Sequence, residues 1–342
     1  MLYIETSGIA RATGRSIGRA FPEELEKCMA AYAPWLVDRG NEITSAIGRI
    51  RGLVQDQWPD LWEETEGMSE GSGIDLETLT GYRFFPDVRM YMNQGCTVVF
   101  FPDSDVGPIL GRNCDLSPSF DPDVQICHVS RPASGIPSLT VGYLGIPGTP
   151  GHNGNGLAKG SASAHTNVVD DRPDGLPAAL LGGRILHNSS NLGEALQFLR
   201  GRVFLGKPYN LIVSDSSGQS AIIEFAQGRE PVILPREDAA RWQVCTNFFT
   251  SGRVPIAPEA EYLRSAYSRY GRIIHGLQTG DYPLTLEGMK ELLTEVAQPG
   301  LYTDGLGGRV KTAFTHITEV ANGIDHITVG HPAETEFWRV RL

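Results

Sequence analysis

The sequence predicts an α+β fold, built as a four-layer αββα sandwich with a helical segment at its N-terminus. The first third of the chain carries apolar residues at helical spacing, and short runs rich in β-branched and aromatic residues begin after Gly95. Helical patterns return in the second half, and strand-like runs close the chain. Sheets flanked by helices form stacked layers because each element must bury one apolar face.

The expected elements follow one another in a fixed order. Pro22 begins a helix, since proline and the two glutamates after it suit a first helical turn. Asn191 and Glu194 form a capping pair for another helix, and the glycine-rich stretch 145–160 is expected to be a loop. Helices are expected at 176–186, 192–200, 259–276 and 284–297, and strands at 96–101, 124–129, 138–144, 211–214, 221–225, 232–234, 316–320, 326–329 and 337–341.

Composition narrows the range of partners. The 342 residues carry a formal charge of −11, which disfavours a nucleic-acid or anionic-membrane partner. Neither an apolar run long enough to span a membrane nor a secretory signal is evident, so a soluble, cytoplasmic protein is expected. Hydrophobic residues make up 41% of the sequence, which is an ordinary value for a globular protein. The composition leaves open whether the protein forms a homo-oligomer.

The five cysteines are candidate nucleophiles. Cys28 lies on a helical pattern, and Cys127 and Cys245 lie in strand-like runs, where a buried inert thiol is the expected state. Their spacing and the scattered histidines form no zinc motif, so no metal and no resident cofactor are expected. Cys96 differs, because it follows Gly95 and begins a strand.

A cut between Gly95 and Cys96 would explain this context. The new α-amine, with a pKa of roughly 7.7 to 8.0, could then take the proton of its own thiol, whose pKa is about 8.5. Glycine leaves the carbonyl carbon before the cut open to attack, because it carries no β-carbon. Self-cleavage and catalysis would therefore use the same sulfur.

Arg112 and Asp115 follow Cys96 by 16 and 19 residues, on what should be the returning strand of one hairpin. A guanidinium near the sulfur favours the thiolate, and a carboxylate can hold the new ammonium group. Such residues are also common on any hairpin surface, so the spacing alone does not decide their role.

The motifs Gly95-Cys96-Thr97 and Gly111-Arg112-Asn113-Cys114-Asp115 resemble those of N-terminal-nucleophile (Ntn) hydrolases. The resemblance is to the acyl-coenzyme A:6-aminopenicillanic acid acyltransferase (penicillin acyltransferase) family, related to choloylglycine hydrolase and penicillin V acylase. It implies the Ntn-hydrolase fold, with Cys96 as nucleophile and Arg112 and Asp115 in the active site. The 95 residues before Cys96 match the acyltransferase branch, whereas Arg112 resembles the hydrolase branch. Cys114 and Leu116 depart from the family pattern, so a remodelled acyl pocket is expected.

Three further segments resemble the family. Residues 151–157 resemble its G-x-N-x-x-G-L loop, which implies that Asn153 forms part of the oxyanion hole, with Asn155 as the alternative. The run 244–248 resembles the strand that carries the second oxyanion asparagine, here Asn247. The Ser268-Arg269-Tyr270 motif implies an arginine near the nucleophile. Two amide donors suit the oxyanion of acyl transfer, each worth on the order of 3 kcal/mol.

These observations predict a self-processing cysteine enzyme that cleaves or transfers acyl groups at linear amide bonds. Residues 1–95 would form a small subunit and 96–342 a large one, packed together as one integrated domain. The expected partners are a small acyl amide or thioester, with a coenzyme A thioester as an optional co-substrate implied by the family. The catalytic residues are expected to be Cys96, Arg112, Asp115, Asn153, Asn247 and Arg269.

Three alternatives stay open on the sequence. A hydrolase similar to bile-salt hydrolase or penicillin V acylase would share the site and differ in substrate. A papain-like enzyme would pair a cysteine with a histidine, such as His316 or His326, and would need no cleavage. A non-catalytic binding protein on the same fold would show neither processing nor a reactive thiol.

Overall fold

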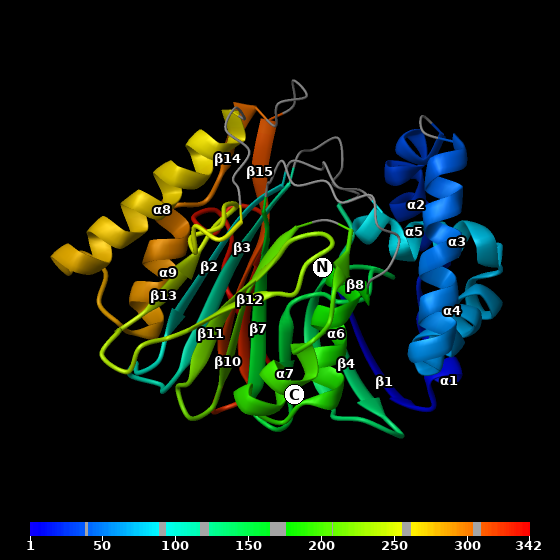
Figure 1. Ribbon diagram of the computed structural model, residues 1–342, viewed down its shortest axis with the longest axis horizontal. Helices are drawn as coiled ribbons and strands as arrows, with labels where there is room; N and C mark the ends of the chain where they lie inside the picture. The colour runs from blue at the N-terminus through cyan, green and yellow to red at the C-terminus, as the bar shows by residue number, and fades with distance from the viewer. Residues whose placement is uncertain are drawn as a thin grey trace.

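A computed structural model describes most of the chain. The described residues are 1–37, 40–88, 94–116, 123–164, 176–206, 208–254, 261–303 and 309–342. Within them two β-sheets face each other, with helices on both outer faces (Figure 1). The predicted αββα sandwich is therefore confirmed.

The first sheet consists mainly of antiparallel strands. Its strand order is β1 (Leu2–Gly8), β4 (Gln125–Pro132), β5 (Ser138–Tyr143), β6 (Gly151–Asn153), β7 (Leu157–Ser163), β10 (Tyr209–Asp215), β11 (Ser220–Phe225) and β12 (Val232–Pro235). Strand β1 pairs with β4 in parallel, so the N-terminal strand forms one edge of this sheet. A small separate sheet joins β8 (Leu176–Pro177) and β9 (Phe204–Leu205).

The second sheet carries the predicted nucleophile. Its order is β13 (Gln243–Cys245), β2 (Gln94–Phe101), β3 (Ile109–Leu116), β15 (Arg309–Glu319), β16 (Ile324–Val329) and β17 (Trp338–Arg341), and β14 (Pro299–Thr303) pairs with β15. Strands β2 and β3 form the predicted hairpin and lie in the interior of this sheet.

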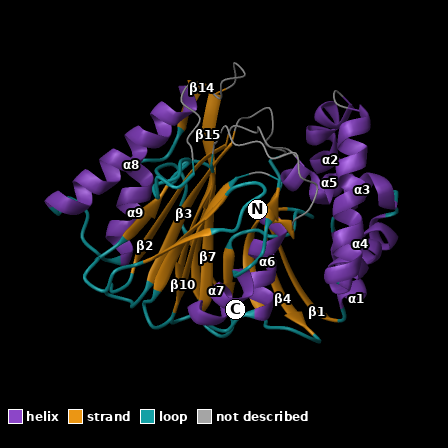
Figure 2. Cartoon of the chain, viewed as in Figure 1, coloured by secondary structure: helices purple, strands orange, loops and turns teal. Residues whose placement is uncertain are grey.

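Helices complete the layers (Figure 2). Helices α8 (Glu261–Thr279) and α9 (Leu286–Glu295) cover the outer face of the second sheet, and α6 (Ala178–Asn188) and α7 (Leu192–Leu199) cover that of the first. Asn191 caps α7 as predicted, because its side chain accepts a hydrogen bond from the Glu194 N–H at 2.9 Å. The N-terminal helices lie beside the first sheet: α1 (Ala10–Ala20), α2 (Pro22–Val37), α3 (Gly40–Gln57), α4 (Pro59–Ser72) and α5 (Leu76–Val88).

Two predictions about strands were wrong. The first third of the chain was expected to be helical, but Leu2–Gly8 form strand β1, and part of the stretch 145–160 is strand, in β6 and β7. These strands are rich in small residues because the sheets approach closely there. A β-carbon at Gly160 would lie 2.6 Å from Val98 Cγ1 on the opposite sheet. A run of small residues is typical of a loop, but here these residues allow the two sheets to pack closely.

The chain buries apolar side chains in separate layers. Val98 and Phe100 of β2 pack between the sheets against Ala158, Ala162 and Ile212. The alternate residues Val99 and Phe101 instead pack under α8 and α9.

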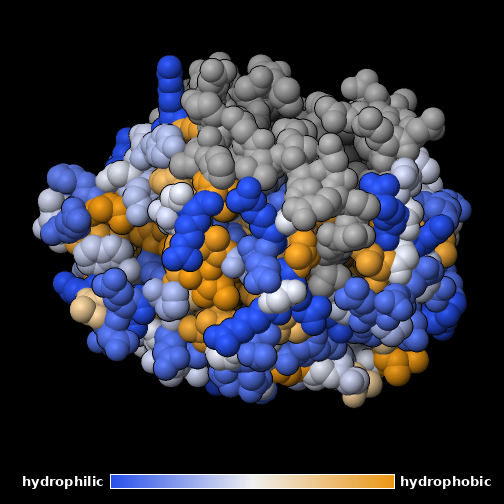
Figure 3. Space-filling view, viewed as in Figure 1, coloured by the Kyte–Doolittle hydropathy of each residue, from blue (hydrophilic) through white to orange (hydrophobic). Residues whose placement is uncertain are grey.

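On the face in Figure 3 the surface is mainly hydrophilic, with hydrophobic side chains most visible in the middle. No helix in the described part of the chain combines the length and hydrophobicity needed to cross a bilayer.

Helices α1 and α4 pack with almost no space between their backbones. A β-carbon at Gly14 would lie 1.9 Å from the Glu64 carbonyl oxygen, and one at Gly67 would lie 2.0 Å from the Arg11 carbonyl oxygen. These distances are far shorter than a van der Waals contact, so glycine is required at both positions.

Substituting Gly14 with alanine should lower the free energy of unfolding by about 1 to 3 kcal/mol, because the two helices must move apart. Gly52 of α3 is the matched control, since a β-carbon there meets no atom within 4 Å. Gly52→Ala should stabilise the protein by about 0.5 to 1 kcal/mol through helix propensity. Urea unfolding measures both variants, and equal effects would contradict the close packing.

Candidate active site

The β2–β3 hairpin brings together residues that the sequence separates. In the antiparallel register Gly95 lies opposite Asp115, Cys96 opposite Cys114, and Val98 opposite Arg112. The predicted offsets of 16 and 19 residues therefore correspond to neighbouring positions on one pair of strands.

Strand alternation sends the side chains to two faces of the sheet. The Cys96 side chain packs between the sheets with Val98 and Ala162. Asp115 faces the helical side, where its Oδ1 accepts a hydrogen bond from the Thr312 hydroxyl at 2.7 Å. The sulfur and the carboxylate thus lie on opposite faces of the hairpin, on either side of the Gly95–Cys96 segment.

Arg112 holds the sulfur from within the sandwich. Its Nη2 lies 3.4 Å from Cys96 Sγ, and its Nε donates to the Ser161 carbonyl oxygen of the facing sheet at 2.7 Å. The side chain is buried, and its Nη1 has no hydrogen-bond partner among the described residues. A guanidinium at this distance favours the thiolate form of a cysteine.

Two side chains hold the main chain of Cys96. Asn247 Oδ1 accepts a hydrogen bond from the Cys96 N–H at 3.0 Å. Arg269 Nη1 donates to the Cys96 carbonyl oxygen at 2.6 Å and to Thr97 Oγ1 at 2.7 Å. Its Nη2 donates to Asn247 Oδ1 at 2.7 Å, so Asn247 and Arg269 also hold each other. The buried guanidinium thereby gains several acceptors.

Asp115 is a buried carboxylate with one oxygen available. Its Oδ2 has no hydrogen-bond partner among the described residues and lies 3.9 Å from Arg269 Nη1. Burial raises the pKa of Asp115 to about 7, against the opposing effect of Arg269. A β-carbon at Gly95 would lie 3.1 Å from this Oδ2, so the carboxylate lies directly against the residue before Cys96.

The structure does not bring Asn153 to this cluster. Asn153 ends β6, in the turn before β7, whereas Cys96 lies near the other end of β7, at Ser161 and Ser163. Its Nδ2 donates to the carbonyl oxygens of Leu186 and Ser189, at 2.8 and 2.7 Å. Both amide protons are thus used in holding α6, so the predicted oxyanion role of Asn153 is not retained.

Asn155 does not replace Asn153 in that role. Its Nδ2 donates to Ser190 Oγ at 3.0 Å in an exposed position, and its N–H donates to Asn153 Oδ1 at 3.1 Å. Both asparagines therefore belong to the turn that joins β6 and β7.

The histidines considered for a papain-like mechanism are held by carboxylates. His316 Nε2 lies 2.6 Å from Asp325 Oδ1, and His326 Nε2 lies 2.7 Å from Glu319 Oε1. All four side chains are buried. This pairing leaves neither Nε2 available as a base for Cys96. Among the described residues, no group of three or more His, Cys, Asp or Glu could hold a metal ion.

Sequence reasoning missed two residues of the cluster. Ser163 accepts hydrogen bonds from Asn247 Nδ2, at 2.8 Å to its carbonyl oxygen and 3.3 Å to its hydroxyl. Thr312 binds Asp115, as described above. Ser163 lies in an alternating Ser-Ala-Ser run directly after the stretch 145–160 that we expected to be a loop, and no strand was expected there, so only a correct strand prediction could have located it.

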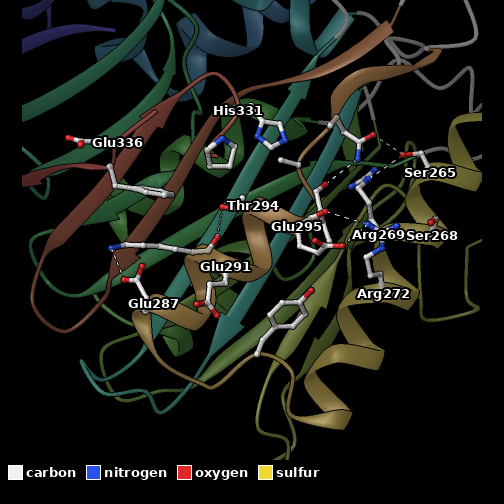
Figure 4. Close-up of a pocket in the computed structure, with 17 residues that line it drawn as sticks. Ser265, Ser268, Arg269, Arg272, Glu287, Glu291, Thr294, Glu295, His331 and Glu336 are labelled. Atoms are coloured by element: carbon white, nitrogen blue, oxygen red, sulfur yellow. Dashed lines mark hydrogen bonds and ion pairs between the residues drawn. The ribbon is translucent and has the colours of Figure 1, made fainter. Parts of the chain in front are cut away.

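A cavity of about 980 Å³ lies on the other side of the second sheet, between α8, α9 and the segment 331–337 (Figure 4). Arg269 lines it and is shared with the Cys96 cluster. The cavity lies on the helical side, whereas the sulfur faces the interior between the sheets. A molecule in this cavity would therefore not meet the sulfur directly.

Two solved structures resemble this chain in fold. The αββα layers are those of N-terminal-nucleophile hydrolases. Penicillin V acylase from Agrobacterium tumefaciens superposes with a TM-score of 0.52 at 16% identity, covering 72% of this chain and 86% of that one. A mutant of the conjugated bile acid hydrolase from Clostridium perfringens gives a TM-score of 0.49 at 14% identity, covering 72% and 92%. No curated protein sequence gives a significant match.

The chain belongs to the acyl-coenzyme A:6-aminopenicillanic acid acyl-transferase family, whose model matches residues 102–334. The matched region contains Arg112, Asp115, Asn247 and Arg269, and it begins six residues after Cys96. Membership of this family makes the protein an enzyme that acts on acyl groups.

The raised pKa of Asp115 has a consequence for stability. Its folded pKa is about 7 and its ordinary value is 3.8, so the folded state holds the proton more tightly. The stabilising contribution is therefore full below about pH 4 and is lost as the pH rises through 7. It should amount to roughly 1 to 4 kcal/mol.

Urea unfolding of Cys96→Ala at pH 5 and pH 8 measures this contribution in a chain unable to use the sulfur. Adding Asp115→Asn should flatten the difference between the two pH values, whereas adding Asn at the exposed Asp103 should not. Equal pH dependence with and without Asp115→Asn would contradict the assignment.

Proposed function

We propose that this protein is a self-processing cysteine enzyme of the Ntn type. It would cut its own chain between Gly95 and Cys96, and then cleave or transfer acyl groups at linear amide bonds through an acyl-enzyme on Cys96. The supporting observation is the convergence on one residue: Arg112 contacts its sulfur, Asn247 its N–H and Arg269 its carbonyl oxygen.

Self-cleavage would begin when Cys96 Sγ attacks the Gly95 carbonyl carbon. The C–N bond breaks, the nitrogen takes a proton and becomes the Cys96 α-amine, and Gly95 is left as a thioester on the sulfur. Water then hydrolyses the thioester, which releases the Gly95 carboxylate and restores the thiol. The absence of a side chain at Gly95 favours this attack, since a β-carbon there would crowd Asp115.

The amine produced would serve as the base in turnover. Its nitrogen is the atom that Asn247 Oδ1 already contacts at 3.0 Å, so the new group has an acceptor in place. Asp115 Oδ2, without a hydrogen-bond partner in the described chain, is suited to orient the ammonium form. An amine with a pKa of roughly 7.7 to 8.0 exchanges protons readily with a thiol near neutral pH.

Two donors near the sulfur suit the oxyanion of the acyl-transfer step. Asn247 Nδ2 donates to the Ser163 carbonyl oxygen at 2.8 Å and makes a weaker 3.3 Å contact with the Ser163 hydroxyl, and a negatively charged oxygen could replace that weaker contact. Arg112 Nη1 is buried and without a partner among the described residues. We assign these two groups the role first predicted for Asn153 and Asn247. Such donors lower the barrier by on the order of 3 kcal/mol each.

The fragments 1–95 and 96–342 should remain together after the cut. Strand β1 of the first fragment is paired along its length with β4 of the second. The Tyr82 hydroxyl donates to the Leu144 carbonyl oxygen at 2.6 Å in a buried position. Separating the fragments would expose these groups and the apolar cluster around Met68 and Leu144.

The proposed substrates are small acyl amides or thioesters. The family name points to an acyl-coenzyme A thioester as an optional co-substrate, with an amine as acceptor. The likeness to penicillin V acylase favours water as acceptor, and therefore a hydrolase, as the second candidate. Both candidates use the same acyl-enzyme on Cys96 and differ in the molecule that removes the acyl group.

Purified wild-type protein should separate on a denaturing gel into fragments of 95 and 247 residues, and the larger should begin at Cys96. Cys96→Ala should stay at full length, because it has no sulfur to attack Gly95. Cys127→Ala is the control, since Cys127 is buried in a different cluster and should not affect cleavage. Cleavage of Cys96→Ala would refute the proposed mechanism.

A further inference from the structure

The position opposite the proposed nucleophile carries a second thiol. Cys114 pairs directly with Cys96 in the β2–β3 register, on the face that points between the sheets. Both side chains are buried, at 1% exposure for Cys96 and 7% for Cys114. The mechanism proposed above does not use Cys114.

The backbone contacts define which kind of cross-strand pair this is. The Cys96 N–H is bonded to Asn247 and its carbonyl oxygen to Arg269. Because both groups of a strand residue point to the same side, neither is directed at β3. Cys96 and Cys114 are therefore a non-hydrogen-bonded pair, the closer type, with Cα atoms about 4.5 Å apart. A disulfide requires Cα atoms about 4.4 to 6.8 Å apart, so this spacing permits one.

The charges around the pair give the two thiols different roles. Arg112 contacts Cys96 Sγ at 3.4 Å, which favours a thiolate there. A hydrogen bond to Cys96 and burial raise the pKa of Cys114 well above its ordinary value, and they outweigh the effect of Arg112, which also acts on Cys114 and lowers its pKa. Cys96 is thus the sulfur that reacts first, and Cys114 keeps its proton until a partner forms.

We propose that Cys114 is a resolving thiol that forms a reversible disulfide with Cys96 when the protein meets a peroxide. The disulfide would protect Cys96 from irreversible oxidation and withhold it from catalysis until a thiol reductant releases it. The loss of turnover rests on the proposed role of Cys96, whereas the disulfide itself does not.

The chemistry balances with hydrogen peroxide as the oxidant. The Cys96 thiolate attacks one peroxide oxygen, the O–O bond breaks, and hydroxide leaves and is protonated to water. This step gives a sulfenic acid on Cys96. Cys114 then attacks the Cys96 sulfur, the S–S bond forms, and the S–O bond breaks with release of a second water. Two thiols lose two electrons in all, and one peroxide becomes two waters.

Two other cysteines are possible competitors, and geometry disfavours both. Cys245 lies opposite Val98, two residues along from Cys96, so the pair is diagonal instead of direct. Cys127 belongs to the facing sheet and shares a cluster with Cys114. Burial raises the pKa of Cys127 to about 12, which makes it a slow reactant. The test therefore includes Cys245→Ser and Cys127→Ser as matched controls.

The test treats the purified, processed protein with hydrogen peroxide, blocks remaining thiols with iodoacetamide, and maps the peptides by mass spectrometry without reduction. Wild-type protein should show peptides joined through Cys96 and Cys114, with a loss of about 2 Da. After dithiothreitol, iodoacetamide should again label Cys96 nearly completely. The Cys245→Ser and Cys127→Ser variants should behave like the wild type.

In Cys114→Ser the same treatment should carry Cys96 to sulfinic and sulfonic acids, so that dithiothreitol restores at least tenfold less labelling of Cys96 than in wild type. Cys114→Ala should give the same result and guards against a folding defect of one variant. A link from Cys96 to Cys245, or full recovery of Cys96 in both Cys114 variants, would overturn the proposal. A wild-type disulfide in a chain that does not self-process would leave this inference intact and refute the proposed function instead.

Discussion

The buried guanidinium of Arg269 is the constraint on which the site depends. It extends from helix α8 to the second sheet and donates to the Cys96 carbonyl oxygen, Thr97 Oγ1 and Asn247 Oδ1. A buried charge without such acceptors would cost several kcal/mol. Helix α8, strand β2 and the segment after β13 must therefore keep one relative position, which in turn fixes the backbone of Cys96.

Contacts with the facing sheet also position the reactive sulfur. Arg112 connects Cys96 to the Ser161 carbonyl oxygen of the facing sheet, and Asn247 connects it to Ser163. These contacts require a close approach of the sheets, which Gly160 allows opposite Val98. Strand alternation then separates the two functions, with the sulfur between the sheets and Asp115 on the helical side, next to the bond proposed to break.

Short-range patterns in the sequence predicted the layers, whereas Asn247 and Arg269 were expected from the resemblance to the family alone. Offsets along a hairpin become neighbouring positions in the register, so Arg112 and Asp115 could be placed beside Cys96. The predicted oxyanion role of Asn153 was not retained, because an asparagine in an Asn-Gly turn and an oxyanion asparagine look alike in sequence. The hydrogen bonds of Asn153 to Leu186 and Ser189 distinguish the two cases. Strand β1 was missed since its partner β4 lies more than a hundred residues away.

Self-activation of Cys96 is tested most directly by labelling the processed protein with iodoacetamide and determining the first residue of the polypeptide that carries the label. Every polypeptide labelled at Cys96 should begin with that residue, and the labelling rate should follow the titration of an amine near pH 8. Rapid labelling of Cys96, together with full turnover, in a chain whose peptide bond to Gly95 is intact would contradict activation by self-cleavage.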